Sequence, residues 1–274
     1  MVFERKKYKK FALMQLKGRW TTVVLATLIT SLVLFVFSFT ENRGFVSIDQ
    51  LRALGNASYE EILAFLSSTA KPVTLPFFIL SLIEALVNFI FEIALAYLFI
   101  AISRSPDPVS LKVFFEGLNN WGRGILVGLW TTLWIFLWML VAIPMSIVLL
   151  VPFILFEASA DTIAVFTPIL VFISFIPMFI KSIAYSMGVY LVAEFPNLPI
   201  TRSLNISKKI TKGYKWNIFV TELSFIGWIL LCILTLGIGS LWLSPYINMT
   251  QVNIYHALIK DALETEKIHP EDLN

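Results

Sequence analysis

The chain has 274 residues, of which 58% are hydrophobic and 14% charged, and its mean hydropathy is +0.81. Soluble domains carry roughly 45–50% apolar and about 25% charged residues, so this composition excludes an ordinary soluble domain and indicates a membrane protein. The sole cysteine, Cys232, excludes an intramolecular disulfide and a cysteine-rich metal site. Its apolar surroundings favour a small buried side chain over a redox role.

Six apolar segments are long enough to cross a hydrocarbon core of about 30 Å, which takes roughly 20 helical residues. We therefore predict an all-α, polytopic helical membrane protein that forms a single membrane domain, with short interfacial amphipathic helices beside the spans. A basic cytoplasmic segment covers residues 1–19 and an acidic cytoplasmic tail covers 259–274. The expected transmembrane segments are 20–39, 75–103, 125–156, 162–193, 217–236 and 240–258. Kinks are expected in the third and fourth spans at Pro144, Pro152, Pro168 and Pro177.

The distribution of basic residues predicts the orientation of these spans. Of the 21 Lys and Arg residues, 17 fall in segments assigned to the cytoplasm, three fall in outer segments, and Lys181 lies within a span. Cytoplasmic loops carry an excess of Lys and Arg, so both termini are expected in the cytoplasm of a bacterial plasma membrane. The same topology explains the net charge of +3 without nucleic-acid binding.

Clustered lysines on the cytoplasmic side also predict contacts with anionic inner-leaflet lipids, which attract surface bases by about 1 kcal/mol each. Topology alone accounts for the same clusters, so both interpretations stand. The expected lipid contacts are Lys6, Lys7, Lys9, Lys10, Lys208, Lys209, Lys212 and Lys215.

The connecting segments carry helix signals. Ser47 with Gln50 and Ser58 with Glu61 have the capping-box spacing, which predicts two short helices on the outer surface. The second, YEEILAFL, either lies on the bilayer or packs on the bundle. On the inner side, LKVFFEGL places apolar residues at 111, 114, 115 and 118, which predicts a surface-lying amphipathic helix.

Ionisable side chains inside the expected spans are costly, and they usually face the bundle interior and find a partner. Glu84, Asn88 and Glu92 recur every four residues and so share one stripe of the second span. Glu92 and Lys181 lie at matching depth, which predicts an ion pair between the second and fourth spans with Tyr185 close by. Such a pair is either a structural bridge or part of a pathway for a proton, an ion or a lipid head group.

Catalytic signatures are missing from the sequence. It has no H-E-x-x-H, no G-x-S-x-G, no P-loop and no dinucleotide glycine fingerprint. Glu84 and Glu92 would be separated by about 12 Å of helix, too far to act on one bond. We therefore expect no enzyme, no cofactor and no metal. The expected role is a lipid- or protein-binding module of the cell envelope; the alternative is a carrier or channel through a polar cavity at Glu84, Glu92 and Lys181.

The uncharged stretch SFIGWILLCILTLGIGSLWLSPYINMT, Ser224 to Thr250, is predicted to form two spans that meet at LGIG. Gly237 and Gly239 permit a backbone reversal there. The sequence GILVG, Gly124 to Gly128, matches the small-xxx-small pattern of closely packed helices.

Several segments resemble successive blocks of a bacterial integral-membrane family, domain of unknown function 975. They are KKFALMQLKGRW, LKVFFEGL, LWMLVAIP, IPMFIKSIAYSMGVYLVAEFPNL, ITKGYKWNIF and LSFIGWILLCILTLGIGSLWLSPYINMTQVNIYHAL. The family is distantly similar to the membrane region of some glycerophosphodiester phosphodiesterases, whose catalytic domain has no counterpart here. The resemblance implies a helical membrane domain without an established activity. This chain departs from the family pattern by carrying Met145 to Phe175 between two of the blocks.

Overall fold

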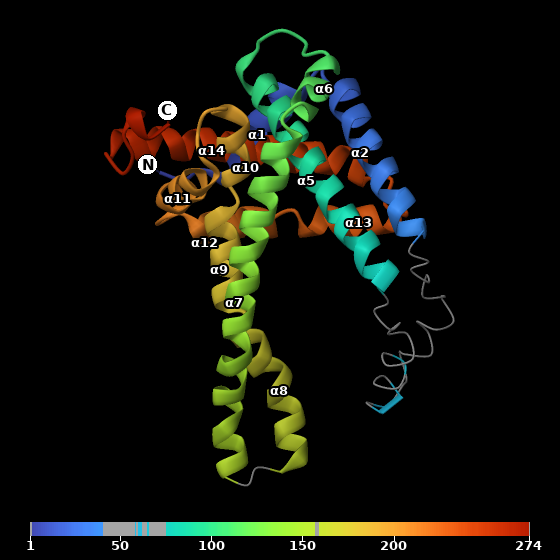
Figure 1. Ribbon diagram of the computed structural model, residues 1–274, viewed down its shortest axis with the longest axis vertical. Coiled ribbons are helices and arrows are strands. Elements are labelled where there is room, and N and C mark those ends of the chain that lie inside the picture. Colours follow the sequence, from blue (N-terminus) through green and yellow to red (C-terminus); the bar gives the residue numbers. More distant parts are fainter. Residues whose placement is uncertain are drawn as a thin grey trace. The chain divides into compact units, whose positions relative to one another are not determined.

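The computed structural model describes residues 2–40, 75–156 and 159–273, together with residues 58, 60, 61 and 65. All regular secondary structure in these residues is helical, which confirms the all-α prediction (Figure 1). The chain divides into two compact units: the larger combines Met1–Leu28 with Phe89–Asn274, and the second is Ile29–Asn88.

The helices follow one another closely in the sequence. They are α1 (Arg5–Leu16), α2 (Trp20–Thr40), α5 (Leu75–Arg104), α6 (Lys112–Leu118), α7 (Trp121–Leu155), α8 (Ala160–Ser174), α9 (Ile176–Tyr185), α10 (Gly188–Glu194), α11 (Ile200–Thr211), α12 (Lys215–Leu223), α13 (Ile226–Leu234), α14 (Ser240–Glu264) and the 3-10 helix η1 (Pro270–Leu273).

Five helical segments of the described residues are long and apolar enough to cross a membrane. They are Trp20–Phe37, Leu75–Arg104, Trp121–Phe153, Val165–Glu194 and Lys215–Leu234. The structure therefore supports a membrane-embedded protein, while the predicted count of six is not confirmed. The expected sixth span, 240–258, falls in α14, whose polar residues include Gln251, Asn253 and His256.

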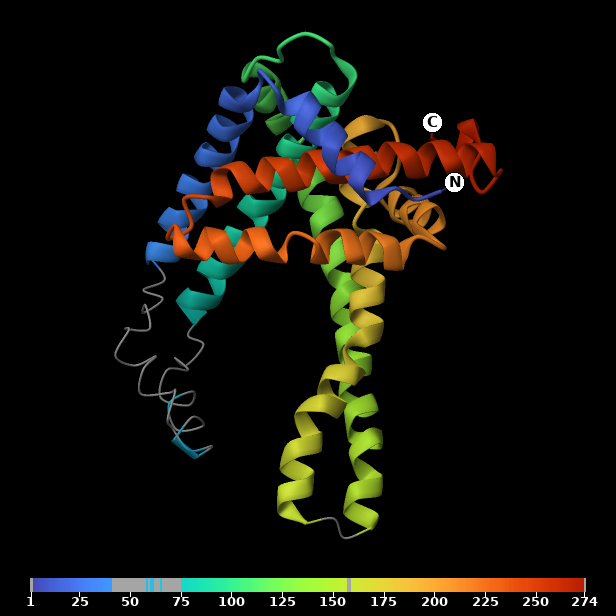
Figure 2. The ribbon, with the colours of Figure 1, turned by 180° about the vertical axis from the view of Figure 1, so that it is seen from behind.

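Helix α14 instead packs against other helices of the larger unit. Its side chains Met249, Val252, Tyr255 and Leu258 are fully buried, and α1 and α13 both pack against it. Figures 1 and 2 show α13 and α14 side by side, both running crosswise to α7 and α9. Burial of one face of α14 against other helices explains why it tolerates polar residues that a lipid-facing span would not.

The proline-rich third and fourth spans form a helical hairpin. Helix α7 runs through Pro144 and Pro152 without a break, whereas α8 ends at Ser174 and Pro177 lies in the first turn of α9. Figure 2 shows α9 side by side with α7. Residues 145–175 thus include the end of α7 and all of α8.

Small residues set the approach of α7 to α5. A Cβ atom on Gly124 would lie 2.8 Å from the carbonyl oxygen of Phe89 and 2.6 Å from Ile93 Cγ2, and one on Gly128 would lie 2.2 Å from the Phe89 ring. The GILVG segment therefore allows the two helices a close approach that larger side chains would block.

The α13–α14 connection lies at the LGIG segment. Gly237 has a φ of +86°, and its amide donates to the carbonyl of Cys232 at 2.8 Å. A Cβ on Gly239 would lie 3.0 Å from both Cys232 Sγ and Thr235 Oγ1. The two glycines thus contribute differently: Gly237 supplies the left-handed backbone and Gly239 supplies space.

The predicted surface helices are described only in part. The Ser58 amide donates to the Glu61 carboxylate at 2.7 Å, and the Glu61 amide donates to Ser58 Oγ at 3.3 Å, which confirms that capping box. The pair Ser47 and Gln50 and most of YEEILAFL lie outside the described residues. Helix α6 packs on α5 through fully buried Phe114, whose ring stacks 6.1 Å from that of Phe91, while Phe115 stays exposed.

Candidate functional site

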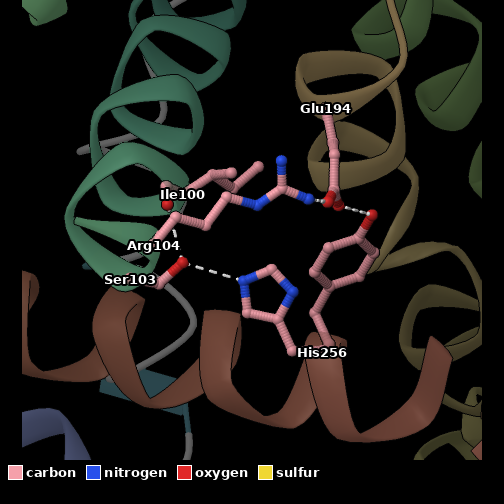
Figure 3. Close-up of polar contacts among 6 residues, drawn as sticks. Ile100, Ser103, Arg104, Glu194 and His256 are labelled. Carbon is pink, nitrogen blue, oxygen red and sulfur yellow. Dashed lines mark hydrogen bonds and ion pairs between the residues drawn. The ribbon is translucent and has the colours of Figure 1, made fainter. Parts of the chain in front are cut away.

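An ion pair with a buried carboxylate joins the ends of α5 and α10 in the larger unit (Figure 3). The carboxylate of Glu194 accepts from Arg104 of α5 and from the hydroxyl of Tyr255 of α14. The Glu194 side chain is 6% exposed, whereas that of Arg104 is 60% exposed. The carboxylate of Glu194 therefore lies inside the protein, whereas the guanidinium of Arg104 reaches solvent. Together with Tyr255, the pair links α5, α10 and α14 at one point.

Beside this pair, Ser103 Oγ lies 2.8 Å from His256 Nε2 (Figure 3). A serine next to a histidine is the arrangement of an activated nucleophile. Ser103 Oγ, however, donates its only proton to the carbonyl of Ile100 at 2.6 Å, so Nε2–H must be the donor toward Ser103. In that tautomer the histidine does not withdraw the serine proton, and the contact holds α5 against α14.

Further polar contacts extend the network. The Tyr190 hydroxyl donates to Gln251 Oε1 at 3.0 Å, and Gln251 Nε2 donates to Glu222 Oε1 at 3.4 Å. Asn253 Nδ2 donates to Gln15 Oε1 at 2.8 Å. Polar side chains of α14 thus connect it with α1, α10 and α12, and buried polar groups that are paired in this way make a packing unique.

Glu194 and Tyr255 are not among the residues that the sequence predicted. The available signal was the charge of Glu194 at the end of an apolar run, where long charged side chains usually reach water. Burial of Glu194 depends on α10 packing against neighbouring helices, which no local pattern in the sequence expresses.

The predicted ion pair between Glu92 and Lys181 is wrong for the structure described: among the ion pairs of the described residues, none joins these two side chains. Lys181 Nζ instead lies 4.4 Å from the ring centroid of Trp138 on α7. Helix breaks around Phe175 and Ser186 leave α9 beside α7, so equal depth along the two spans does not bring Lys181 to Glu92.

Glu92 and Tyr185 nevertheless line one small cavity of about 100 Å³, together with Thr131, Ser182 and Ser186. Its wall is rich in hydroxyl groups at a depth where the surroundings are apolar. Glu84 and Asn88 belong to the second unit, in which Glu84 is half-buried and Asn88 is exposed.

The predicted lipid-contact lysines fall on two helices and at the start of a third. Lys6, Lys7 and Lys10 are exposed on α1, and Lys9 is half-buried. Lys215 begins α12, close enough to Lys181 for the two charges to repel each other. Lys208 and Lys209 lie in the last turn of α11, and Lys212 follows that helix directly.

Helix α11 has one buried and one basic face. Leu204, Ile206, Ser207 and Ile210 are buried, and Ser207 Oγ donates to the carbonyl of Ala184 at 2.7 Å. The opposite face surrounds a surface hollow of about 540 Å³. This hollow, called here the α11 basic hollow, is lined by Arg202, Asn205, Ile206, Lys208, Lys209, Lys212 and Asp272.

Two members of the α11 basic hollow are held in place. Arg202 pairs with the carboxylate of Asp272 at 3.0 Å, and Lys208 Nζ lies 5.7 Å from the Tyr185 ring centroid and 6.0 Å from that of Trp134. Cation–π contacts of this kind orient a lysine without neutralising it. The hollow therefore offers positive charge beside aromatic rings of two candidate spans.

In the described part of the chain, no group of three or more His, Cys, Asp or Glu side chains is placed to hold a metal ion. No curated protein matches the chain, and no solved structure does. The similarity to the membrane region of glycerophosphodiester phosphodiesterases therefore stays a prediction. The family described as "Protein of unknown function (DUF975)" matches residues 1–262, nearly the whole length, and the chain belongs to this family.

Proposed function

We propose that the protein is a non-enzymatic, multi-pass protein of the bacterial plasma membrane that binds anionic phospholipid head groups in the α11 basic hollow. The observation that carries this proposal is the placement of Lys208, Lys209 and Lys212 around one hollow. Lys208 is held there against Trp134 and Tyr185, which belong to segments apolar enough to cross a bilayer. Aromatic rings favour the interface between hydrocarbon and head groups, the level at which phosphates are found.

The expected strength follows from the number of bases. Each lysine near an anionic membrane surface contributes about 1 kcal/mol, so three contribute about 3 kcal/mol, or roughly a hundredfold in affinity. Arg202 adds less, because Asp272 already neutralises it.

The test compares two variants with the same change in charge. The first variant replaces Lys208, Lys209 and Lys212 by Gln. The second variant replaces the exposed α1 residues Lys6, Lys7 and Lys10 by Gln. Each full-length protein is purified in detergent, and bound phosphatidylglycerol is titrated by native mass spectrometry against phosphatidylcholine. We expect the α11 variant to lose most of its preference for phosphatidylglycerol and the α1 variant to keep it. An equal loss of the phosphatidylglycerol preference in both variants would show that this preference depends on net charge alone, and would refute the assignment of the site to α11.

A carrier or channel is the second candidate, and the hydroxyl-lined cavity at Glu92 favours it. A carboxylate inside a span commonly marks a pathway for a proton or cation. In this hypothesis Glu92→Gln abolishes proton or sodium flux into liposomes that contain the protein. Glu116→Gln, on the surface helix α6, serves as the control. Flux that exceeds that of empty liposomes and is equal in both variants would exclude Glu92 from the pathway.

A further inference from the structure

An apolar groove lies on another face of the larger unit, between α1, α13 and α14. Its volume is about 370 Å³, and its lining includes Leu13, Trp20, Trp228, Cys232 and Trp242. None of the ten lining residues is charged. Several of the groove's side chains are also about half exposed, among them Trp228, at 54%, and Trp242, at 49%. The groove is thus open along its length.

The groove is continuous with a larger apolar surface. Leu230, Ile233 and Leu234 of α13 are exposed, and α13 belongs to a segment apolar enough to cross a membrane. Such a surface is stable against hydrocarbon and costly against water. In a bilayer, this surface would give lipid chains direct access to the groove.

A lysine lies at one end of this groove. Lys9 precedes Leu13 by one turn on the same face of α1. Its Nζ lies 3.9 Å from the ring centroid of Phe225 and 5.9 Å from that of Tyr246, which itself lines the groove. Nζ also donates to Ser224 Oγ at 3.0 Å and to the Ser224 carbonyl at 3.4 Å, which leaves one of its hydrogens for a ligand. An ammonium has three donors, and no ion pair among the described residues includes Lys9. Its charge is thus oriented but not neutralised.

We propose that the groove is a binding site for an anionic phospholipid, with one acyl chain along Trp228, Cys232 and Trp242 and the phosphate against Lys9. Charge complementarity at Lys9 and the apolar lining select a ligand with an anionic head and a hydrocarbon chain, which excludes free phosphate. Burial of Lys9 and the nearby charge of Arg5 lower the pKa of the Lys9 ammonium, and a bound phosphate relieves that effect. This site is separate from the α11 basic hollow and does not depend on it.

Cys232, the sole cysteine of the chain, lines the groove, so its rate of alkylation measures whether the groove is occupied. The full-length protein in dodecyl maltoside is alkylated with N-ethylmaleimide, and the rate is followed by intact mass. Dioleoyl phosphatidylglycerol, phosphatidylcholine with the same chains, and glycerol 3-phosphate are added in turn. We expect phosphatidylglycerol to slow alkylation at about fivefold lower concentration than phosphatidylcholine, and glycerol 3-phosphate to give no protection.

Two neighbouring lysines supply the matched variants. Lys9→Gln is expected to bring phosphatidylglycerol to the level of phosphatidylcholine, whereas Lys10→Gln, at an exposed position, keeps the difference. The proposal is overturned if both lipids protect Cys232 equally in the unaltered protein, or if Lys9→Gln changes nothing. Protection that rises with protein concentration without added lipid would identify a second copy as the occupant and would also overturn it.

A third variant keeps the test decisive if Lys9→Gln fails to fold. Leu231→Trp enlarges a lining residue that is 52% exposed and leaves Lys9 unchanged. We expect it to reduce the phosphatidylglycerol retained per protein, measured by mass spectrometry, and an unchanged amount refutes the groove as the site. The triple Gln variant of α11 should leave Cys232 protection intact, so failure of either lipid site is distinguished from failure of the other.

Discussion

The ion pair between Arg104 and Glu194 should respond unequally to loss of its two partners. In Arg104→Met the carboxylate of Glu194 remains, and its side chain is 6% exposed. In Glu194→Gln the guanidinium of Arg104 remains, and its side chain is 60% exposed. An unpaired charge is costly when water cannot reach it and cheap when water can, so removal of the arginine should be the more damaging change.

The size of each effect follows from these exposures. Removing one partner from a fully buried pair costs roughly 3–5 kcal/mol, and the water around Arg104 reduces this to about 2–3 kcal/mol for Arg104→Met. Glu194→Gln keeps an acceptor for the Tyr255 hydroxyl and should cost about 1 kcal/mol.

Both values can be measured by equilibrium unfolding in mixed dodecyl maltoside–SDS micelles, with helicity as the signal. The exposed pair of Lys112 and Glu116, 3.6 Å apart on α6, is the control. Loss of either control partner should change the unfolding free energy by less than about 0.5 kcal/mol. If Glu194→Gln proves as destabilising as Arg104→Met, the burial argument is wrong and the charge of Glu194 contributes through other contacts.

Three further predictions concern packing, pH and topology. Gly124→Ala should destabilise the protein by about 1–3 kcal/mol in the same unfolding assay, because its Cβ would lie 2.8 Å from a backbone oxygen; a neutral effect would show that α5 and α7 separate easily. Burial of Asp261 opposes its ionisation, but the hydrogen bonds that its carboxylate accepts, among them those from Tyr214 at 2.9 Å and Lys267 at 3.3 Å, outweigh burial and lower the pKa of the Asp261 carboxyl below its usual value. This stabilisation is present above the unfolded-state pKa and is lost as the pH falls through the folded-state pKa. Asp261→Asn should therefore lower the free energy of unfolding by about 1 kcal/mol at pH 7 and by progressively less below about pH 4. A constant difference across that pH range would contradict the stabilising role of the ionised carboxylate. Single cysteines at each terminus of a Cys232→Ser protein should react with a membrane-impermeant maleimide in inside-out vesicles and not in intact cells, and the reverse pattern would overturn cytoplasmic termini.

The sequence predicts the long apolar helices better than it predicts how they pack. Long apolar runs can be recognised from the local sequence, because each residue of a span must be compatible with hydrocarbon whatever its neighbours are. Five of the expected spans accordingly coincide with long apolar helices, whereas the sixth falls in α14, which is not among the candidate spans. Its Gln251 and Asn253 bond to Glu222 and Gln15, residues 29 and 238 positions away in the chain. Contacts between such distant residues leave no periodic trace in the sequence.

The polar residues also show that local signals are predictable from the sequence and long-range contacts are not. Lys181 and Glu92 stand out in the sequence as residues that need an explanation, since a charge in an apolar run is visible in the letters. Their partners are not predictable, because the breaks before and after α9 place Lys181 against Trp138 rather than against α5. The charge of Glu194 at the end of an apolar run is visible as well, but such a residue commonly reaches water, so the sequence indicates neither its burial nor its contact with Tyr255.

Hydropathy and glycine backbone freedom are local properties, so the letters alone predict a helical membrane protein with a turn at LGIG, where Gly237 has a φ of +86°. Which cationic side chains are neutralised, and which keep their charge, follows from the way the helices pack. Arg104 is paired with Glu194, whereas Lys9 and Lys208 lie against aromatic rings with their charge intact. That distinction arises from helix packing over long sequence separations, and it is the reason why one lipid site is proposed at Lys9 rather than at Lys10, and the other in the α11 basic hollow, where Lys208 lies beside Lys209 and Lys212.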